Sequence, residues 1–375
     1  MASTPVTSTP ALLLAAVHER LGATFTALDT ALDTTLDGGL PVPARYGPVE
    51  EEYRALREEC GAADLSWRGL LEVSGKDRQR FLNAYVTCEV KGLAPGQGAY
   101  GFFTNPQGRI LSDLVLASLD DRFWLLVGPG QEEALTGHLQ KYILADRVEI
   151  RRLEAVVPLA VIGPRAATAL GLSDPLEPWQ HVRATVQGIE VTVQRSEGFG
   201  APAFVLWTPA TEAGALLERL VDAGLARPVG FEALEVLRAE AGIGRFGRDF
   251  GPDNFPQETG AEEAAVSYTK GCYLGQEVVA RIHYRGGVQK GLRGLAFEPG
   301  TTAAPGIELF YEGRSAGIAT TVVHSFALGR PLGLGILHKR AAEPGTRLGT
   351  SLDMGSIENA GTVEVLDLPP VPGAA

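Results

Sequence analysis

Hydrophobic and polar positions follow regular periods along the chain, most clearly after residue 70. Leu70 to Val73 has the apolar composition of a strand, and Phe81 and Leu82 begin an apolar helix face. Asn105 to Gly108 is a turn between two strand-like runs. The pattern predicts, in order, a strand at 70–73, a helix from Ser74, paired strands at 99–104 and 109–119, a strand at 122–127 and a helix at 131–142. This order is typical of a split α+β layer, with helices on one face of an antiparallel sheet.

Two later stretches have different patterns. Residues 156 to 242 again mix strand and helix periods, and end in a predicted helix that carries Leu234 and Leu237 on one side. Residues 293 to 368 are almost entirely short apolar runs separated by glycine and proline. The first stretch therefore predicts a second α+β region, and the second favours a small β-barrel.

The first 45 residues stand apart from these regions. Residues 1 to 9 are rich in Ser, Thr and Pro, and we expect them to be disordered. Apolar residues at helical spacing over Ala11 to Leu32 predict an amphipathic helix. The chain is thus divided into an extension at 1–45, α+β regions at 46–152 and 153–290, and a barrel at 291–368.

Composition narrows the functional classes. A length of 375 residues exceeds one ordinary core, and 45% hydrophobic with 21% charged residues is typical of globular proteins. A net charge of -12 argues against nucleic-acid binding as the main activity, since that needs a basic surface, although it leaves room for a small basic pocket. No apolar run reaches the roughly 18 residues of a membrane helix, and no signal-peptide pattern is present. We therefore expect a cytoplasmic protein without membrane or direct nucleic-acid partners.

The common chemical motifs are absent from the sequence. Cys60, Cys88 and Cys272 are far apart and form no CxxC or Cys/His cluster, so neither a zinc site nor a disulfide framework is expected. Glycine-rich nucleotide motifs and HExxH are also missing. We expect no metal ligands.

One stretch, Ser267 to Arg293, concentrates basic groups in this acidic chain. Lys270 precedes Cys272 by two residues, and a short helix is predicted from Gly275 to Arg281. A thiol ahead of a helix N-terminus and near cations is expected to have a lowered pKa and to be reactive. A buried structural cysteine beside a solvated basic turn is the alternative, and the residues alone leave both open.

Three other segments carry candidate site residues. Glu240 lies in an otherwise apolar helix end; it is either a paired or exposed carboxylate, or a recessed acceptor for the amidine-like edge of a flat ligand. The aromatic strand Tyr100 to Phe103 favours core packing. Asn105 to Leu114, which contains Asp113, is by itself a hairpin.

The run KGCYLGQE followed by VVARIHYRGG resembles the signature of YgfZ-type folate-binding proteins, which are relatives of the glycine cleavage system T protein, an aminomethyltransferase. The resemblance extends from about Tyr46 to Leu368. Its weaker parts occur in the same order as in that family: ADLS at 63–66, LLEVSG at 70–75, PGQ at 95–97, the hairpin at 105–113 and LRAEAG at 237–242.

This resemblance implies three domains in a ring, with tetrahydrofolate as the cofactor in the central channel. Two domains are split α+β (ferredoxin-like) and interleaved, and the third is the small barrel. A pterin offers a donor-rich edge to Glu240 and a flat face to Tyr100 or Phe102, and Arg281, Arg285 or Lys290 could neutralise its anionic tail. The residues implied to bind folate are Tyr100, Phe102, Asp113, Glu240, Tyr273, Gln276, Glu277, Arg281 and Arg285, and the implied catalytic groups are Cys272, Lys270 and Asp113.

Departures from the T-protein pattern favour the YgfZ-type branch. T proteins generally have an acidic pair, D-D-L, where this chain has Ser112-Asp113-Leu114, and a phenylalanine or similar residue in place of Cys272. Their R-T-G-Y-T-G-E-x-G-F-E block is reduced to a trace at residues 195–204. The resemblance thus implies a tetrahydrofolate-binding accessory protein for iron–sulfur cluster assembly or repair, with iron–sulfur proteins as partners and an effect on tRNA modification. The alternatives are a folate-dependent aminomethyltransferase or demethylase, with Asp113 at the folate nitrogens, and a non-catalytic scaffold that binds a partner through the barrel.

Overall fold

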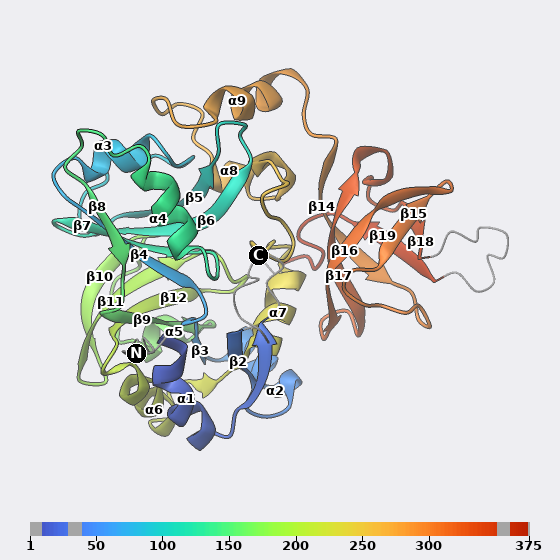
Figure 1. The fold of residues 1–375 in the computed structure, drawn as a ribbon. Coiled ribbons are helices and arrows are strands. Elements are labelled where there is room, and N and C mark those ends of the chain that lie inside the picture. Colours follow the sequence, from blue (N-terminus) through green and yellow to red (C-terminus); the bar gives the residue numbers. More distant parts are fainter. Residues whose placement is uncertain (1–9, 29–39, 351–360, 374–375) are drawn as a thin grey trace, which may run out of the picture.

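The computed structural model describes residues 10–28, 40–350 and 361–373. Figure 1 shows two sheets with their covering helices on one side and a separate barrel on the other, joined through helix α7 and the segments that follow it. The predicted α+β class with a C-terminal barrel is confirmed. The disordered segment expected at residues 1–9 lies outside the described residues.

The first sheet has five antiparallel strands in the order β5-β6-β7-β4-β8. Helices α3 and α4 lie on one face, where Leu71, Phe103 and Leu114 pack with Leu135. The predicted strands, hairpin and helices of this region are therefore confirmed. The element bounds are β4 Gly69–Ser74, α3 Arg78–Asn83, β5 Gly98–Thr104, β6 Ile110–Ser118, β7 Arg122–Val127, α4 Glu132–Gln140 and β8 Glu149–Arg152.

The second sheet has six strands in the order β10-β11-β12-β9-β3-β13. Strand β3 lies within the predicted first region, which ends at Arg152, but it pairs with β9 of the second region. The first region therefore contributes a strand to the second sheet. Helices α1 and α6 pack on one face through residues such as Leu14 and Leu217. The bounds are β3 Gly61–Asp64, β9 Val156–Ile162, α5 Ala166–Ala169, β10 His181–Val186, β11 Ile189–Ser196, β12 Ala203–Pro209, α6 Ala213–Asp222 and β13 Arg227–Pro228.

The other faces of the two sheets pack against each other. Trp124 of β7 and Trp207 of β12 have ring centroids 5.7 Å apart. The Nε2 group of Gln194 in β11 donates to the carbonyl of Leu116 in β6 at 2.9 Å. The two faces that meet form one buried core cluster, which includes Val115 of β6 and Val205 of β12.

The N-terminal helix is shorter than predicted. Helix α1 (Pro10–Arg20) ends two residues before Gly22, whose φ of 81° is left-handed, and β1 (Thr24–Leu28) follows. A glycine adopts this conformation without the strain a side chain would impose, so the chain turns there instead of continuing the helix predicted to Leu32. Strand β1 pairs with β2 (Leu40–Arg45), next to α2 (Val49–Glu58) and α7 (Phe231–Glu240).

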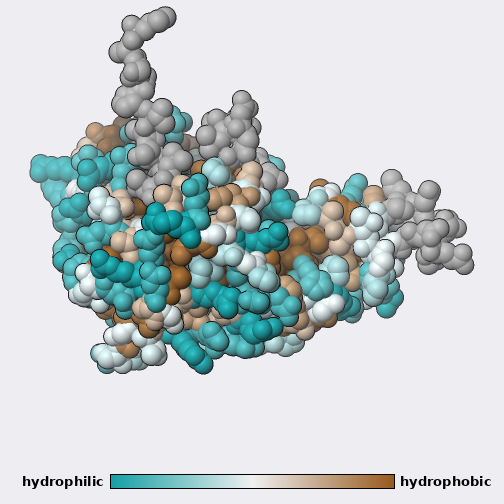
Figure 2. Space-filling model, turned by 90° about the horizontal axis from the view of Figure 1, so that it is seen from below, coloured by the Kyte–Doolittle hydropathy of each residue, from teal (hydrophilic) through white to brown (hydrophobic). Residues whose placement is uncertain are grey.

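The last region is a closed six-stranded barrel in the order β14-β17-β16-β15-β18-β19. In Figure 2 it forms a lobe beside the two-sheet body, and apolar residues gather where the two meet. The bounds are η1 Pro256–Glu258, α8 Glu262–Ala265, α9 Gln276–Arg285, β14 Lys290–Phe297, β15 Glu308–Tyr311, β16 Arg314–Ser325, β17 Arg330–His338, η2 Lys339–Ala341, β18 Arg347–Gly349 and β19 Thr362–Leu366. Across the described ranges, no helix combines the length and the apolar character needed to cross a membrane.

Candidate ligand-binding site

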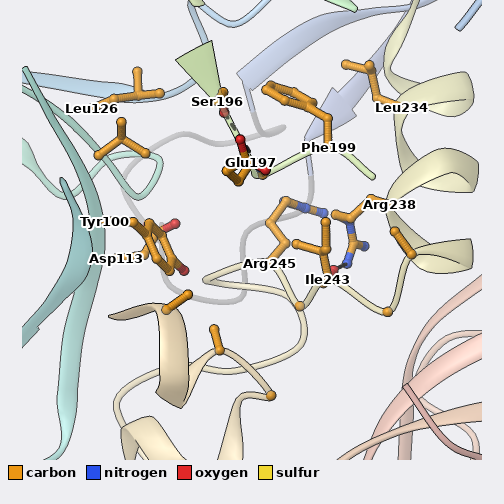
Figure 3. A pocket seen from close by; sticks show the side chains of 18 of the residues that line it. Tyr100, Asp113, Leu126, Ser196, Glu197, Phe199, Leu234, Arg238, Ile243 and Arg245 are labelled. Carbon is orange, nitrogen blue, oxygen red and sulfur yellow. Dashed lines mark hydrogen bonds between the residues drawn. The ribbon is translucent and has the colours of Figure 1, made fainter. Parts of the chain in front are cut away.

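A cavity of about 390 Å³ lies between the two sheets, helix α7 and the segments that lead to the barrel. Its size is within the range of small-molecule sites in proteins. Figure 3 shows side chains from both sheets and from α7 pointing into it. Its walls are mainly apolar and aromatic, with a few charged groups: Arg68, Asp113, Glu197, Glu235, Arg238 and Arg245.

The predicted hairpin brings two predicted site residues to this cavity. Asp113 lies opposite Phe102 in the β5–β6 register, and Tyr100 lies opposite Val115. Because side chains alternate across a strand, Tyr100 and Asp113 share the face turned toward the second sheet. Ser112 points to the other face, where its fully buried hydroxyl accepts a hydrogen bond from Gly128 N–H at 2.9 Å. A second acid at position 112 would therefore not add a charge to the cavity.

Asp113 is held by an arginine that sequence reasoning missed. Nη2 of Arg68 lies 3.0 Å from both carboxylate oxygens of Asp113, and both side chains are largely buried. Arg68 also donates from Nε to the carbonyl of Val127 at 2.7 Å, which fixes the guanidinium at the end of β7. A buried arginine–carboxylate contact of this kind orients the acid at the cavity wall.

The turn that delivers Arg68 is anchored by Asp64 at the end of β3. Asp64 Oδ1 accepts from Ser66 N–H at 2.7 Å, and Oδ2 accepts from the Ser66 hydroxyl at 2.9 Å. His18 of α1 contacts the same Oδ2 at 3.0 Å, and the Trp67 indole donates to the Asp64 carbonyl at 3.2 Å. The Asx-type bonds hold the backbone in a tight turn, which places Trp67 and Arg68 at the cavity.

Aromatic rings form a flat wall beside Asp113. Tyr100 stacks on Trp179 with ring centroids 5.6 Å apart and planes 20° apart. Burial, together with the nearby Asp113 carboxylate, raises the pKa of Tyr100, so this phenol stays protonated and is a hydrogen-bond donor. The arrangement can hold a flat heterocycle through stacking while one edge meets a carboxylate.

The opposite wall is a network of charges on α7 and the following loop. Arg238 donates to Glu235 from Nε at 3.0 Å and from Nη2 at 2.7 Å, and from Nη1 to Asp249 at 2.6 Å. Burial alone would raise the pKa of Glu235, but the charges of Arg238 and Arg245 outweigh it and lower that pKa to about 2. Glu235 is thus an anion over the physiological pH range and is not a proton donor there.

The loop between β11 and β12 closes a further side of the cavity. Ser196, Glu197, Gly198 and Phe199 line it, and Glu197 pairs with Arg195 Nε at 2.7 Å. This loop carries the trace of the T-protein block, so the altered residues do lie at the cavity. The positions at which this chain departs from the T-protein block therefore lie at the cavity wall.

Glu240 is not among the residues that line the cavity. Its side chain is fully buried, Oε2 accepts from the Tyr53 hydroxyl at 2.6 Å, and Oε1 accepts from the Ser325 hydroxyl at 2.6 Å and Ala327 N–H at 3.2 Å. The structure thus places this predicted acceptor for the ligand edge away from the cavity, with hydrogen-bond partners from the protein itself. Glu240 satisfies its charge with groups of α2 and the barrel, and joins them to α7.

Lys270 does not orient Cys272. Its side chain is 6% exposed, and Nζ donates to the carbonyls of Asn83 and Val86 at 2.8 and 2.7 Å and to that of Cys88. Burial lowers the pKa of Lys270 to about 8. The ammonium donates to carbonyls at and just after the end of α3 and so ties the motif to the first sheet; the structure thus places this predicted catalytic residue away from the cavity.

Cys272 is exposed and its thiol is free, whereas Cys60 and Cys88 are buried. It precedes the N-terminus of α9 as predicted, and Gly275, with φ 84°, begins the helix against the backbone of Asn105 and Gly108. Cys272 does not line the cavity. The structure therefore decides against the buried-cysteine alternative, but it separates the thiol from Asp113 and Tyr100.

The remaining predicted residues also lie away from the cavity. Phe102 is fully buried in a core cluster with Phe246 and Phe250. Tyr273 is buried with its hydroxyl unpartnered in the described structure, and Lys290 lies 3.8 Å from Glu258. The side chains that project from α9 and were expected to bind folate do not line the cavity: Gln276, Glu277, Arg281 and Arg285. Among the described residues, no group of three or more His, Cys, Asp or Glu side chains is arranged to hold a metal ion.

Several cavity residues had no distinctive sequence signal. Trp179 lies in a loop with φ 62°, and Arg245 follows α7 in an irregular segment. Arg68 directly follows the ADLSW run, whose aspartate forms the anchoring turn, so an Asx-turn pattern could have indicated that position. Arg238 lies in the LRAEAG segment that was singled out for Glu240 instead.

Comparison with known proteins places this geometry in a family. The family described as "GCVT N-terminal domain" matches residues 26–270. A Bacillus subtilis protein named aminomethyltransferase is 27% identical over 319 residues, which cover 82% of this chain and 88% of that protein. A Desulforamulus reducens protein of the same name is 29% identical over 321 residues, covering 83% and 87%.

A solved structure supports the same relationship along nearly the whole chain. The glycine cleavage system aminomethyltransferase T from Bartonella henselae superposes with a TM-score of 0.83 at 27% identity, covering 96% of this chain and 97% of that one. The match includes the two sheets that form the cavity as well as the barrel. This chain therefore belongs to the family defined by the GCVT N-terminal domain.

Proposed function

We propose that this protein binds a tetrahydrofolate in the cavity between its sheets and transfers a one-carbon unit there, as a folate-dependent aminomethyltransferase or a related transferase. The observation that carries the proposal is Asp113, which the ion pair with Arg68 holds in place at the wall that also carries the Tyr100–Trp179 stack. The family and its aminomethyltransferase relatives support the same activity. This function was the alternative to the iron–sulfur role in the sequence analysis, and the comparisons favour it.

The residues of the cavity suit a reduced folate. Its bicyclic ring is flat and needs an apolar slot, which Leu126, Phe199 and the Tyr100–Trp179 pair provide. Its ring N–H groups need acceptors, and Asp113 offers carboxylate oxygens at the cavity wall. In the predicted site Glu240 had this role; in the structure the carboxylates that line the cavity are those of Asp113, Glu197 and Glu235.

Asp113 has a defined electrostatic role in such a reaction. When bound, tetrahydrofolate supplies the nitrogen to which the one-carbon unit is attached. A carboxylate fixed by Arg68 stabilises positive charge that develops next to it, and costs no reorganisation because the ion pair already exists. The buried Tyr100 hydroxyl, whose pKa is raised, adds a neutral donor on the same wall.

The activity can be tested with an aminomethylated lipoyl donor and tetrahydrofolate. We expect the protein to form methylenetetrahydrofolate, and Asp113→Asn to lower kcat by roughly 100-fold, because removal of one preorganised charge costs about that much. Ser112→Ala is the matched control, since Ser112 is the neighbouring position on the opposite strand face. If wild-type protein forms no product, or if both variants lose activity equally, the proposal is contradicted.

One observation favours a second candidate function. This function is the YgfZ-type support of iron–sulfur enzymes, with its downstream effect on tRNA modification. Cys272 presents a free, exposed thiol within the KGCYLGQE motif, on a loop that Lys270 fixes to the first sheet. An exposed thiol at a fixed position can react or ligate. The test is restoration of iron–sulfur enzyme activity in a deletion strain by wild-type protein and by Cys272→Ala. Equal restoration by both would make the thiol irrelevant to that role.

A further inference from the structure

Arg245 is a buried cation, and two of its side-chain nitrogens lack a hydrogen-bond acceptor among the described residues. The residue is 8% exposed, and within the described part of the chain neither Nε nor Nη1 has a hydrogen-bond partner. Its backbone N–H donates to Asp249 at 2.9 Å, so the residue is held in place by its main chain while the guanidinium stays available. Buried guanidinium groups are normally hydrogen-bonded on several nitrogens, so an unmet set of donors points to an absent acceptor.

The neighbouring acids are already committed to other donors. Nε of Arg245 lies 3.3 Å from Glu235 Oε1, but both Glu235 oxygens accept hydrogen bonds from Arg238. Asp249 accepts from Arg238 and from the hydroxyls of Thr320 and Thr321. The guanidinium carbon of Arg245 also lies 5.9 Å from the ring centroid of Trp67 and 5.1 Å from that of Phe231. Burial lowers the pKa of Arg245, in keeping with a cation that the protein itself compensates incompletely.

The guanidinium of Arg245 faces the cavity between the two sheets. Arg245 lines the cavity, and Figure 3 shows it across from Tyr100 and Asp113. It also borders a second cavity of about 470 Å³ beneath β1 and β16, which Arg248 lines too. Acceptors for its free N–H groups can therefore come from a molecule in the cavity without displacing any described side chain.

The charges of the wall restrict the kind of acceptor. The ionisable side chains that line the cavity comprise three cations, Arg68, Arg238 and Arg245, and three anions, Asp113, Glu197 and Glu235. A singly charged planar group adds the least net charge to this balanced wall, whereas a dianionic phosphate would add twice as much. A carboxylate also matches the planar donors of a guanidinium.

We propose that Arg245 binds a carboxylate of the ligand that fills this cavity. Two sources share this chemistry: the glutamyl part of a reduced folate, or the carboxylate of a small amino acid that bears the one-carbon group. The folate source rests on the proposed function, whereas the amino-acid source does not require that folate binds.

Calorimetric titration of three probes separates these sources. The probes are tetrahydrofolate, tetrahydropteroate, which lacks the glutamyl group, and N-methylglycine, each titrated into wild-type protein, Arg245→Met and Arg245→Lys. Because Arg245→Met loses a charged hydrogen-bonded contact, we expect it to bind the carboxylate-bearing ligand roughly 10- to 100-fold more weakly than wild type. Arg245→Lys keeps the charge and should retain part of the affinity. Arg248→Met, three residues away and on the second cavity alone, is the control and should not change affinity.

The pattern of losses identifies the source. If Arg245→Met binds tetrahydrofolate more weakly than wild type but binds tetrahydropteroate equally well, Arg245 contacts the glutamyl group. If only the binding of N-methylglycine is weaker, Arg245 contacts the carboxylate of an amino acid. A general folding defect would weaken the binding of all probes alike. The comparison between ligands therefore distinguishes such a defect from the loss of one contact. If wild type binds the folates and Arg245→Met binds every probe as tightly as wild type, this proposal is overturned while the proposed function stands. If wild type binds N-methylglycine but no folate, the proposed function fails and the Arg245 proposal is still decided by the amino-acid titration. Binding of none of the probes to wild type overturns both.

Discussion

Arg68 and Asp113 form a largely buried ion pair in which Nη2 lies 3.0 Å from each carboxylate oxygen. The pair joins the turn after β3 to strand β6, 45 residues apart in the chain, at the wall of the ligand cavity. This ion pair therefore fixes part of the cavity wall. It also holds the carboxylate that the proposed reaction requires.

The first prediction concerns the stability of this pair. Arg68→Met should destabilise the protein by about 3 to 5 kcal/mol, because it leaves the Asp113 charge buried without its partner. Arg68→Met combined with Asp113→Asn should recover part of that loss. Urea unfolding of the four proteins in a double-mutant cycle gives the coupling energy.

An exposed pair that bridges the two sheets, from β10 to the turn after β6, provides the control for this cycle. Arg183 and Asp120 lie 3.8 Å apart with highly exposed side chains, and their coupling should be within about 1 kcal/mol of zero. Equal coupling in the two cycles would show that the burial of Arg68 and Asp113 has no energetic consequence.

A second prediction follows from the lowered pKa of Glu235. Its folded-state pKa of about 2 lies below the ordinary glutamate value of 4.5, so the unfolded chain takes up the proton first as the pH falls. Its contribution, on the order of 3 kcal/mol, is therefore present above pH 4.5 and is lost between about 4.5 and 2. Glu235→Gln should make stability depend less on pH in that window, as measured by chemical unfolding at several pH values.

Glu232, one turn earlier on α7, is the matched control for Glu235. Its side chain is substantially exposed and lies 3.7 Å from Arg45, so Glu232→Gln should leave the pH dependence almost unchanged. An identical slope of stability against pH in wild type and Glu235→Gln would contradict the assignment.

A third prediction distinguishes the three cysteines. Burial raises the pKa of Cys60 and of Cys88 to about 11, whereas Cys272 is exposed. A thiol reagent at about pH 8 should label one cysteine in the native protein and three after unfolding. Cys272→Ser should abolish native labelling. Persistent labelling of that variant would mean that a buried cysteine is accessible on the timescale of the experiment.

The sequence predicted the elements better than the contacts between them. The β5–β6 hairpin was expected from its turn and its strand periodicity, and its register carries Tyr100 and Asp113 to one face. Arg68 and Trp179 join them through loops, which have no periodic signal, so a single sequence does not indicate that they converge. Cys272 and Lys270 are neighbours in sequence but their side chains have different surroundings, because Nζ turns toward the carbonyls after α3.

Glu240 is a second residue whose contacts a single sequence does not indicate. The reasoning that a buried carboxylate needs partners was correct, but the partners are the hydroxyls of Tyr53 and Ser325, 187 and 85 residues away. No local pattern distinguishes such partners from a ligand. The sequence thus indicated a buried acid in need of partners, and the partners found in the structure belong to the protein itself.

A fourth prediction tests this assignment of Glu240. Glu240→Gln should reduce the free energy of unfolding by about 1 to 3 kcal/mol, because an amide cannot accept on both of its terminal atoms. Folate affinity should stay within about twofold of wild type, since Glu240 does not line the cavity. Loss of ligand binding without loss of stability would instead restore Glu240 to the ligand site.

The most direct test of the account is calorimetric titration of tetrahydrofolate into wild-type protein and into Tyr100→Leu. We predict saturable binding at a single site in wild type, and affinity weaker by about 10-fold or more in Tyr100→Leu, which loses the ring that stacks on Trp179. Absence of binding to wild type at millimolar ligand, or equal affinity in the two proteins, would contradict the claim that this cavity is a folate site.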